Sequence, residues 1–313
     1  MGKILITPRS LTSNPPDELS GLATAGYDVV FCTPGKTPDE AELIKLLPGC
    51  VGWLAGVEPV SEAVIRSADS LRVISRNGTG VDSLPLAAVE AKGIRVERAV
   101  GANATGVAEL AIGLMLSACR NIPAESAGVR DGGWPRLKGR EIEGATVGVV
   151  GMGAIGRKVA TTLVGLGADV VAYDPFNPTL GPLEGAVRYV PLGDLFAQAG
   201  MVTFHCPMPE DGRPILSAAR IASMPEGAIV VNTARAGLVD DGAMIAALDQ
   251  GQVASYATDV FDQEPPEDLR IASHPKVIAT SHVGGLTDGS VMRATRDAVN
   301  NLLTALEAQD VPA

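Results

Sequence analysis

Short apolar runs alternate with longer segments of mixed character along most of the chain. A short apolar run bounded by turn residues is typical of a strand buried on both faces, and apolar residues at helical spacing are typical of a helix. Because strands and helices alternate, the pattern predicts an α/β fold with doubly wound parallel sheets. The predicted strands are Lys3–Thr7, Asp28–Phe31, Val51–Ala55, Leu71–Ser75, Ile94–Glu97, Val147–Val150, Asp169–Tyr173, Val187–Val190, Met201–His205, Ala228–Asn232, Val253–Asp259 and Val277–Thr280.

Helices are predicted between these strands, and a final helix follows the last one. The first five strands and their helices, residues 1–99, make a complete α/β unit, and a chain of 313 residues is long enough for a second. The predicted helices are Pro15–Gly26, Asp39–Leu47, Ser61–Ala68, Val81–Lys92, Arg157–Gly165, Leu192–Ala199, Ile215–Met224, Asp240–Gln250 and Asp288–Ala308.

A further long helix begins at Asn103 or Thr105 and continues to Arg120. It is apolar on almost every side, so it needs burial at a domain junction or a dimer interface. Residues 121–143 are polar and glycine-containing, which predicts a loop or arm. Trp134 in this segment serves either surface packing or an interface, and we expect a homodimer.

Composition narrows the class of partner. The chain is 46% hydrophobic and 19% charged, which is typical of a globular protein. A net charge of −11 argues against nucleic acid, although local arginines can still hold a small anionic substrate. The four cysteines form no metal-type pair, so we expect no metal site and reduced thiols in the cytoplasm. No signal-like or membrane-spanning segment is recognisable, so we expect no membrane association.

One glycine-rich motif points to a dinucleotide. Gly151, Gly153 and Gly156 have the spacing G-x-G-x-x-G between a predicted strand and helix, and Asp174 ends the next strand 23 residues after Gly151. These glycines permit a tight turn, close approach of a pyrophosphate and close helix–strand packing, while the acid can accept hydrogen bonds from ribose hydroxyls. With Ala154 and Ile155 at the helix start, the motif predicts NAD binding, and Asp174 favours NAD over NADP.

Three chemically complementary side chains follow strands of the second half. Arg235, Glu264 and His282 come after the strands that end at Asn232, Asp259 and Thr280. Ligands of a parallel sheet bind beyond the carboxyl ends of its strands. An imidazole can exchange a proton near neutral pH, a carboxylate can orient it, and a guanidinium can hold a carboxylate or polarise a carbonyl. This trio predicts reduction of a carbonyl.

The chain has only three histidines, so the alternatives to His282 are few. His274 precedes Pro275 in a predicted loop, where we expect it to be exposed. His205 ends a strand and either lines the cofactor or only packs. Arg9 and Arg76 follow strands of the first half and either bind a second anionic group or are surface arginines.

The sequence resembles the NAD-dependent D-isomer-specific 2-hydroxyacid dehydrogenases, which include phosphoglycerate dehydrogenase and hydroxypyruvate reductase. Three segments carry the resemblance: Ser75–Asp82, Asn232–Asp240 and Asp259–Pro266. It implies a Rossmann NAD-binding domain at 100–284 and a split flavodoxin-like substrate domain at 1–99, completed by 285–313.

The resemblance also implies residue roles. Arg235 would bind the carboxyl and carbonyl groups of the substrate, His282 would be the general acid/base, and Glu264 would pair with it. Asp259 would bind the nicotinamide carboxamide. The resemblance further implies substrate contacts from the loop Asn77, Gly78, Thr79 and Gly80, and cofactor contacts from Pro207 and Thr233. The other contacts that we expect are Arg76 for the substrate and His205, Ala234, His282 and Gly284 for the cofactor.

One departure and one alternative qualify the resemblance. Many phosphoglycerate dehydrogenases have an arginine after the third strand to hold phosphate, whereas this chain has Glu58, which would repel a phosphate if it pointed inward. Corepressors of the C-terminal-binding-protein type use the same fold as an NAD-sensing scaffold. No added partner-binding tail is recognisable, so the predicted function is hydride transfer between NAD and C2 of a small 2-oxo or 2-hydroxy acid.

Overall fold

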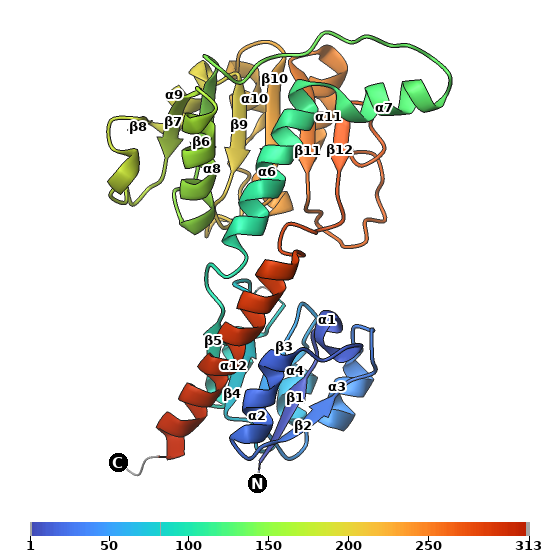
Figure 1. Cartoon of the computed structure of the whole chain (residues 1–313), viewed down its shortest axis with the longest axis vertical. Coiled ribbons are helices and arrows are strands. Elements are labelled where there is room, and N and C mark those ends of the chain that lie inside the picture. The colour runs from blue at the N-terminus through green and yellow to red at the C-terminus, as the bar shows by residue number, and fades with distance from the viewer. Residues whose placement is uncertain (1, 82, 311–313) are drawn as a thin grey trace. The chain divides into compact units, whose positions relative to one another are not determined.

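The computed structural model describes residues 2–81 and 83–310, without the side chains of residues 309 and 310. The chain forms two compact units, one of residues 1–103 with 286–313 and one of residues 104–285. The domain limits expected from the sequence lie within a few residues of this division. Each unit contains one fully parallel sheet, and the predicted α/β class is confirmed (Figure 1).

The sheet of the first unit has the order β2-β1-β3-β4-β5, which is the flavodoxin-like order. Its residues alternate between two cores, as the period of a strand requires. Leu5 and Trp53 pack toward α3, α4 and α5, whereas Ile4 and Leu54 pack toward α2 and α12. The strands are β1 (Lys3–Ile6), β2 (Asp28–Phe31), β3 (Cys50–Ala55), β4 (Val73–Arg76) and β5 (Arg95–Arg98).

The last helix of the chain returns to this first unit. Leu302 and Leu306 of α12 are fully buried against the sheet, and Ser75 Oγ donates to the carbonyl of Ala298 at 2.8 Å (Figure 1). The helices of this unit are α1 (Arg9–Thr12), the 3₁₀ helix η1 (Asp17–Leu19), α2 (Ser20–Thr24), α3 (Glu40–Leu46), α4 (Glu62–Ser67), α5 (Leu86–Ala91) and α12 (Asp288–Asp310).

The sheet of the second unit has the order β12-β11-β10-β9-β6-β7-β8. The chain moves outward in one direction from β6 to β8 and then crosses to β9 on the other side of β6. The carboxyl ends of β6 and β9 therefore form the switch point where open α/β sheets bind ligands. The strands are β6 (Thr146–Val150), β7 (Asp169–Tyr173), β8 (Val187–Tyr189), β9 (Met201–Phe204), β10 (Ala228–Asn232), β11 (Val253–Thr258) and β12 (Val277–Ala279).

Helices cover both faces of this second sheet. Val147 and Val149 pack toward α6 and α8, whereas Val202 and Val230 pack toward α9, α10 and α11. The helices are α6 (Ala104–Cys119), α7 (Ile122–Arg130), α8 (Ala154–Gly165), the 3₁₀ helix η2 (Gly181–Leu183), α9 (Leu192–Gln198), α10 (Ala218–Ser223), the 3₁₀ helix η3 (Ala236–Leu238) and α11 (Asp241–Gln250).

The prediction of a loop over residues 121–143 was wrong in its first part, because α7 lies there. Asn121 adopts a left-handed conformation with φ of 52°, which turns the chain, and Pro123 lies in the first turn of the new helix. None of its residues is buried, so the sequence has no apolar stripe from which this helix could be predicted. Likewise, the helix predicted over Val81–Lys92 is shorter, and its Asp82 lies outside the described residues.

Within the described part of the chain, no single helix is long and apolar enough to cross a membrane. The bent pair α6 and α7, with 62° between them, meets the same test of length and composition together.

Candidate active site

The glycine-rich turn between β6 and α8 has no room for side chains at two positions. Gly151 has a φ of 96°, and a Cβ there would lie 2.6 Å from the carbonyl oxygen of His205. A Cβ at Gly156 would lie 1.9 Å from the carbonyl oxygen of Gly151. At Gly153, by contrast, a Cβ would meet no atom within 4 Å. The backbone at Gly153 is thus open to a pyrophosphate group at the amino end of α8, where Ala154 begins the helix.

The acid at the end of β7 is tied to this turn. Asp174 Oδ2 accepts the N–H of Met152 at 2.8 Å, and Oδ1 accepts the N–H of Phe176 at 3.0 Å. Each carboxylate oxygen can accept more than one hydrogen bond, so capacity for ribose hydroxyls remains. A pocket of about 570 Å³ adjoins Asp174, large enough for an adenosine group. It is lined by Tyr173, Asp174, Pro175, Asn177, Tyr189, Val190 and Pro191.

Tyr189 in this pocket was not predicted from the sequence. Its hydroxyl donates to the carbonyl of Pro178 at 2.8 Å, and burial, with Asp174 nearby, raises the pKa of Tyr189. It ends β8, so applying the strand-end rule to every strand of the second unit would have found it.

Two buried polar atoms beyond β9 and β10 lack partners within the described chain. They are His205 Nδ1 and Thr233 Oγ1. His205 Nε2 lies 2.9 Å from Thr203 Oγ1, and burial lowers the pKa of His205 from 6.5 to about 3. Buried polar atoms are normally satisfied, so these two are suited to hydrogen bonding with a bound dinucleotide. Together with the open backbone at Gly153, they fit NAD.

The turn after β10 presents Arg235. Asn232 fixes this turn, because its Nδ2 donates to the carbonyl of Arg235 at 2.9 Å and its Oδ1 accepts the N–H of Ala234 at 3.1 Å. Arg235 is half-buried, and its Nη1 donates to the carbonyl of Ala234 at 2.7 Å. Pro207, also predicted at the cofactor, is exposed after β9.

Glu264 and His282 form a direct pair. Glu264 Oε2 lies 2.7 Å from His282 Nδ1, and Glu264 Oε1 accepts the N–H of Phe261 at 3.1 Å. The N–H of Phe261 thereby fixes the orientation of Glu264, and Glu264 in turn fixes the orientation of the imidazole. Since Nδ1 faces the carboxylate, Nε2 is the nitrogen left to exchange a proton with a ligand.

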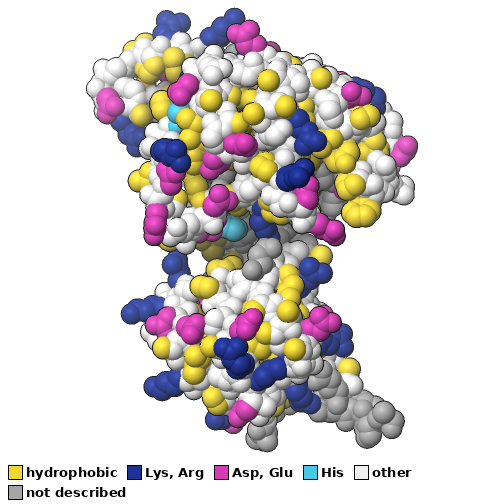
Figure 2. Space-filling view, turned by 180° about the vertical axis from the view of Figure 1, so that it is seen from behind, with side chains coloured by type: hydrophobic (Ala, Val, Ile, Leu, Met, Phe, Trp, Pro, Cys, Tyr) yellow, Lys and Arg dark blue, Asp and Glu magenta, His cyan; other side chains and the backbone are white. Residues whose placement is uncertain are grey.

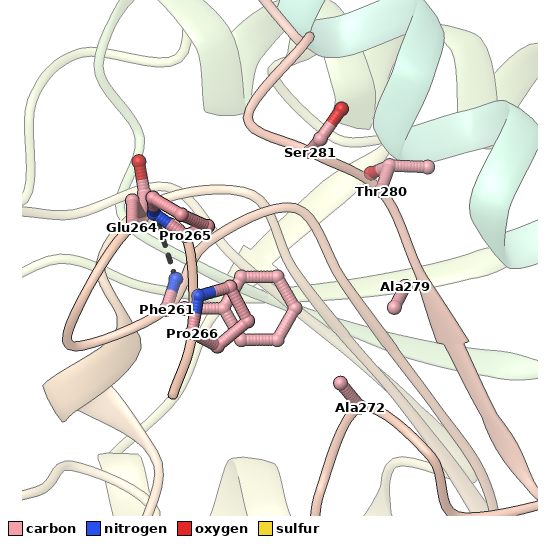
Figure 3. Close-up of a pocket in the computed structure, with 8 residues that line it drawn as sticks. All are labelled: Phe261, Glu264, Pro265, Pro266, Ala272, Ala279, Thr280 and Ser281. Carbon is pink, nitrogen blue, oxygen red and sulfur yellow. Dashed lines mark hydrogen bonds between the residues drawn. The ribbon is translucent and has the colours of Figure 1, made fainter. Parts of the chain in front are cut away.

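A mainly apolar pocket of about 360 Å³ lies beside this pair. Figure 3 shows the Phe261–Pro266 loop on one side of it and the segment from Ala279 to Ser281 on the other. Glu264 belongs to its wall, so the carboxylate of the pair lies at the edge of an apolar surface, and both side chains of the pair are exposed to solvent.

Asp259 holds the turn on which His282 lies. It is 1% exposed; its Oδ1 accepts the N–H of Val283 at 2.9 Å and the hydroxyl of Thr280 at 2.5 Å, and its Oδ2 accepts the N–H of Gly284 at 2.8 Å. His282 has a φ of 54°, a left-handed conformation that residues other than glycine adopt uncommonly. The carboxylate of Asp259 therefore maintains a strained turn, a role that the sequence did not reveal.

The expectation that His274 is exposed was wrong. Its side chain is 10% exposed; Nε2 lies 3.3 Å from Asp249 Oδ1, and Nδ1 accepts the N–H of Lys276 at 3.1 Å. It precedes β12, at the opposite end of the strand from His282.

The first unit holds the predicted substrate loop, from Asn77 to Gly80. Arg76 is buried, not a surface arginine, and its Nε donates to the carbonyl of Gly80 at 3.0 Å. Gly78 has a φ of 151°, and its carbonyl accepts the N–H of Ala99 at 3.0 Å, while Thr79 is exposed. Arg9, in contrast, is exposed at the start of α1.

The predicted residues thus form three groups. Gly151, Gly153, Gly156 and Asp174 lie around one turn. Arg235, Glu264 and His282 follow β10, β11 and β12, which are adjacent and parallel, so their carboxyl ends share one edge of the second sheet. The loop with Arg76 belongs to the first unit. On the face shown in Figure 2, basic and acidic side chains are interspersed, so single arginines and not a broad basic surface would attract an anion.

Comparison with known proteins identifies the family. The family model described as D-isomer specific 2-hydroxyacid dehydrogenase, NAD binding domain, matches residues 112–284. The chain is 35% identical to the hydroxypyruvate reductase of Thermotoga maritima over 274 residues, which cover 86% of this chain and 89% of that protein. It is 38% identical to the D-3-phosphoglycerate dehydrogenase of Sus scrofa over 249 residues, or 79% of this chain and only 47% of that protein.

The crystal structure of a Thermus thermophilus protein has the same fold, with a TM-score of 0.86 at 32% identity, covering 98% of this chain and 97% of that one. The chain therefore belongs to the family of D-isomer specific 2-hydroxyacid dehydrogenases, and it is an NAD-dependent oxidoreductase. The resemblance and the cofactor predicted from the sequence are confirmed.

We predict that Gly153→Ala folds normally but binds NADH about tenfold or more weakly, because a methyl group there fits the folded chain but occupies the space for the pyrophosphate. NADH titration gives the affinity, and the melting temperature reports folding. Gly165→Ala, at the end of α8 with no atom within 4 Å of its Cβ, is the control and should leave the affinity unchanged. Equal NADH affinity in both variants would contradict the assignment.

A second prediction concerns acid stability. Because the pKa of His205 is about 3 in the folded chain and 6.5 in its ordinary state, the unfolded chain takes up a proton first as the pH falls below 6.5. The stability that the neutral His205 contributes above pH 6.5 is therefore lost as the pH falls toward 3. The loss is up to about 2 kcal/mol at about pH 5, and it is smaller where water reaches the ring. The melting temperature of His205→Gln should fall less over this range than that of the unaltered protein. Parallel pH curves for the two proteins would contradict the lowered pKa of His205.

Proposed function

We propose that the protein interconverts a small 2-oxo acid and the corresponding 2-hydroxy acid, of the hydroxypyruvate, glyoxylate or phosphohydroxypyruvate type, with NAD(H). The Glu264–His282 pair supports this most directly, because it is an oriented acid–base pair at the same sheet edge as Arg235. Relatives named hydroxypyruvate reductase and D-3-phosphoglycerate dehydrogenase agree in reaction type and differ in substrate.

His282, Glu264 and Arg235 each have a separate role in the reaction. His282 Nε2 donates a proton to the C2 oxygen during reduction and removes it during oxidation. Glu264 keeps Nδ1 engaged and stabilises the imidazolium that forms in the oxidative direction. The guanidinium of Arg235 binds the substrate carboxylate and polarises the C2 carbonyl. When bound, NADH supplies the hydride to C2.

Asp174 supports a preference for NAD over NADP. Its carboxylate lies at the end of β7 beside the pocket suited to adenosine, where a 2′-phosphate would meet a like charge. The next residues are Pro175, Phe176 and Asn177, so no arginine follows to hold that phosphate.

The test is a screen of hydroxypyruvate, glyoxylate, phosphohydroxypyruvate and other 2-oxo acids with NADH and with NADPH. We predict turnover with NADH and a roughly 10²- to 10⁴-fold lower kcat for His282→Asn, the range for losing a general acid/base. Asparagine suits this position because it tolerates a positive φ.

His274→Asn is the matched control, because this histidine lies at the other end of β12 and should leave kcat unchanged. NADH affinity should be largely retained in His282→Asn and unchanged in His274→Asn. No turnover of any 2-oxo acid would refute the proposed function, full activity of His282→Asn would remove this residue from the mechanism, and equal use of NADPH would refute the role of Asp174.

We also propose that the protein is a homodimer that uses α7 and the segment after it, residues 131–140, as an arm. The arm is ordered, because the N–H of Gly133 donates to the carbonyl of Gly128 at 2.8 Å and the N–H of Leu137 donates to Glu125 Oε1. Yet Val129 is 51% and Trp134 77% exposed, and the arm lies at the outside of the second unit (Figure 1). Exposed aromatic and aliphatic groups on an ordered segment favour contact with a second copy.

Light scattering on a sizing column tests this assembly. We predict about twice the chain mass of 32.1 kDa for the unaltered protein, and a shift to the single-chain mass on Val129→Asp, which introduces a charge into the apolar surface. Leu269→Asp is the control, since Leu269 is similarly exposed at 55% but lies outside the arm. A monomeric unaltered protein, or an equal effect of the two substitutions, would contradict the proposal.

A further inference from the structure

A buried carboxylate lies just beyond the central strand of the first unit. Glu58 follows β3 and is 1% exposed. Its Oε1 accepts the N–H of Gly56 at 3.0 Å and the hydroxyl of Thr7. Thr7, which follows β1, in turn accepts Trp53 Nε1 at 2.8 Å, and both residues are fully buried. The carboxylate therefore ties together the carboxyl ends of β1 and β3.

No cation is paired with Glu58 among the residues that the structure describes. The groups that donate to it, the hydroxyl of Thr7 and the N–H of Gly56, are neutral, and both bind Oε1. Its negative charge also acts on Cys32, which follows β2. The pKa of Cys32 is raised to about 11, mainly by burial and to a smaller extent by the charges of Glu42 and Glu58. In a desolvated position such a charge acts over a longer distance than it would in water.

One peptide group connects this charge to the proposed substrate loop. The N–H of Gly56 donates to Glu58, and the carbonyl of the same peptide, that of Ala55, accepts the N–H of Asn77 at 2.9 Å. Two hydrogen bonds and one peptide group separate the carboxylate from the loop that begins at Asn77, a distance of about 8 Å or less. Glu58 and this loop belong to the same unit, so their juxtaposition is fixed within it.

We propose that Glu58 sets the charge of the substrate, selecting 2-oxo acids with an uncharged side chain over those that carry a phosphate. This inference rests on the proposed function and narrows its substrate class. A three-carbon 2-oxo acid held by its carboxylate at the Asn77–Gly80 loop keeps its third carbon within a few ångströms of the loop. A phosphate ester on that carbon would bring up to two further negative charges toward Glu58.

Two arginines, Arg9 after β1 and Arg76 at the end of β4, also lie at the carboxyl ends of strands of this unit. Arg76 is buried and donates to the carbonyl of Gly80, so its positive charge acts on the loop, and Glu58 weakens the attraction that this charge exerts on a phosphate. Arg9 is exposed, where screening by water weakens it relative to a buried charge. At a similar separation of about 8 Å, the charge of Glu58 disfavours the two further charges of a phosphate by on the order of tenfold or more.

The decisive variant is Glu58→Gln, which retains an oxygen for Thr7 and Gly56 but removes the charge. Initial rates with NADH would be measured for hydroxypyruvate and for phosphohydroxypyruvate. The unaltered protein should prefer hydroxypyruvate, and Glu58→Gln should raise the ratio of kcat/KM for phosphohydroxypyruvate over hydroxypyruvate by about tenfold or more. Glu62→Gln, at an exposed carboxylate of the same unit, should leave the ratio unchanged.

A structural role for Glu58 predicts a different result. Thr7→Val breaks the same buried chain of hydrogen bonds while the charge stays, so it should lower both kcat/KM values and leave their ratio unchanged. A ratio that does not move in Glu58→Gln, or that moves equally in Thr7→Val, would overturn the proposal. So would an unaltered protein that prefers phosphohydroxypyruvate.

A binding measurement separates this inference from the proposed function. Inorganic phosphate should raise the melting temperature of Glu58→Gln more than that of the unaltered protein, whether or not either turns over a 2-oxo acid. Absence of all turnover together with this difference would refute the proposed function and support the charge effect. Equal stabilisation of the two proteins by phosphate would overturn the charge effect.

Discussion

The hydrogen bonds of the Asp259 carboxylate are the constraint on which the acid–base geometry depends. Two backbone N–H groups and one hydroxyl of the 280–284 turn donate to this buried side chain. Asp259 follows β11 and thereby holds the residues that follow β12. His282 lies in the middle of this turn and has a positive φ. Without an acceptor that satisfies both N–H groups, the turn would relax and the imidazole would leave Glu264. Family resemblance implies that Asp259 binds nicotinamide; its contacts here show that it also maintains the turn.

Much of the architecture could be predicted because it follows from local patterns. Strand–helix alternation led to two parallel sheets, and in parallel sheets the carboxyl ends of neighbouring strands share an edge. That rule is enough to group Arg235, Glu264 and His282 without coordinates. The glycine spacing likewise requires no tertiary information, since the clash of a Cβ at Gly156 with the carbonyl of Gly151 is between residues of one turn.

What the sequence could not reveal depends on contacts between distant residues. The alternatives for Arg76 and the orientation of Glu58 were open because burial at a strand end depends on what other strands bring there. Glu58 is held by Thr7, which is 51 residues away in the sequence. Helix α7 escaped prediction for the opposite reason: it has no buried residue, so it lacks the apolar periodicity from which helices are recognised.

The return of α12 to the first unit has a consequence for synthesis on the ribosome. The apolar face formed by Ile4, Leu54 and Val73 is covered by residues near the end of the chain, and the bond between Ser75 and Ala298 spans 223 residues. At typical translation rates this face stays without its cover for on the order of 10–40 s after β5 has emerged. The second unit, which is continuous in sequence, can complete its core during that interval. Chaperone dependence during expression should therefore arise from the first unit, even though its strands are made first.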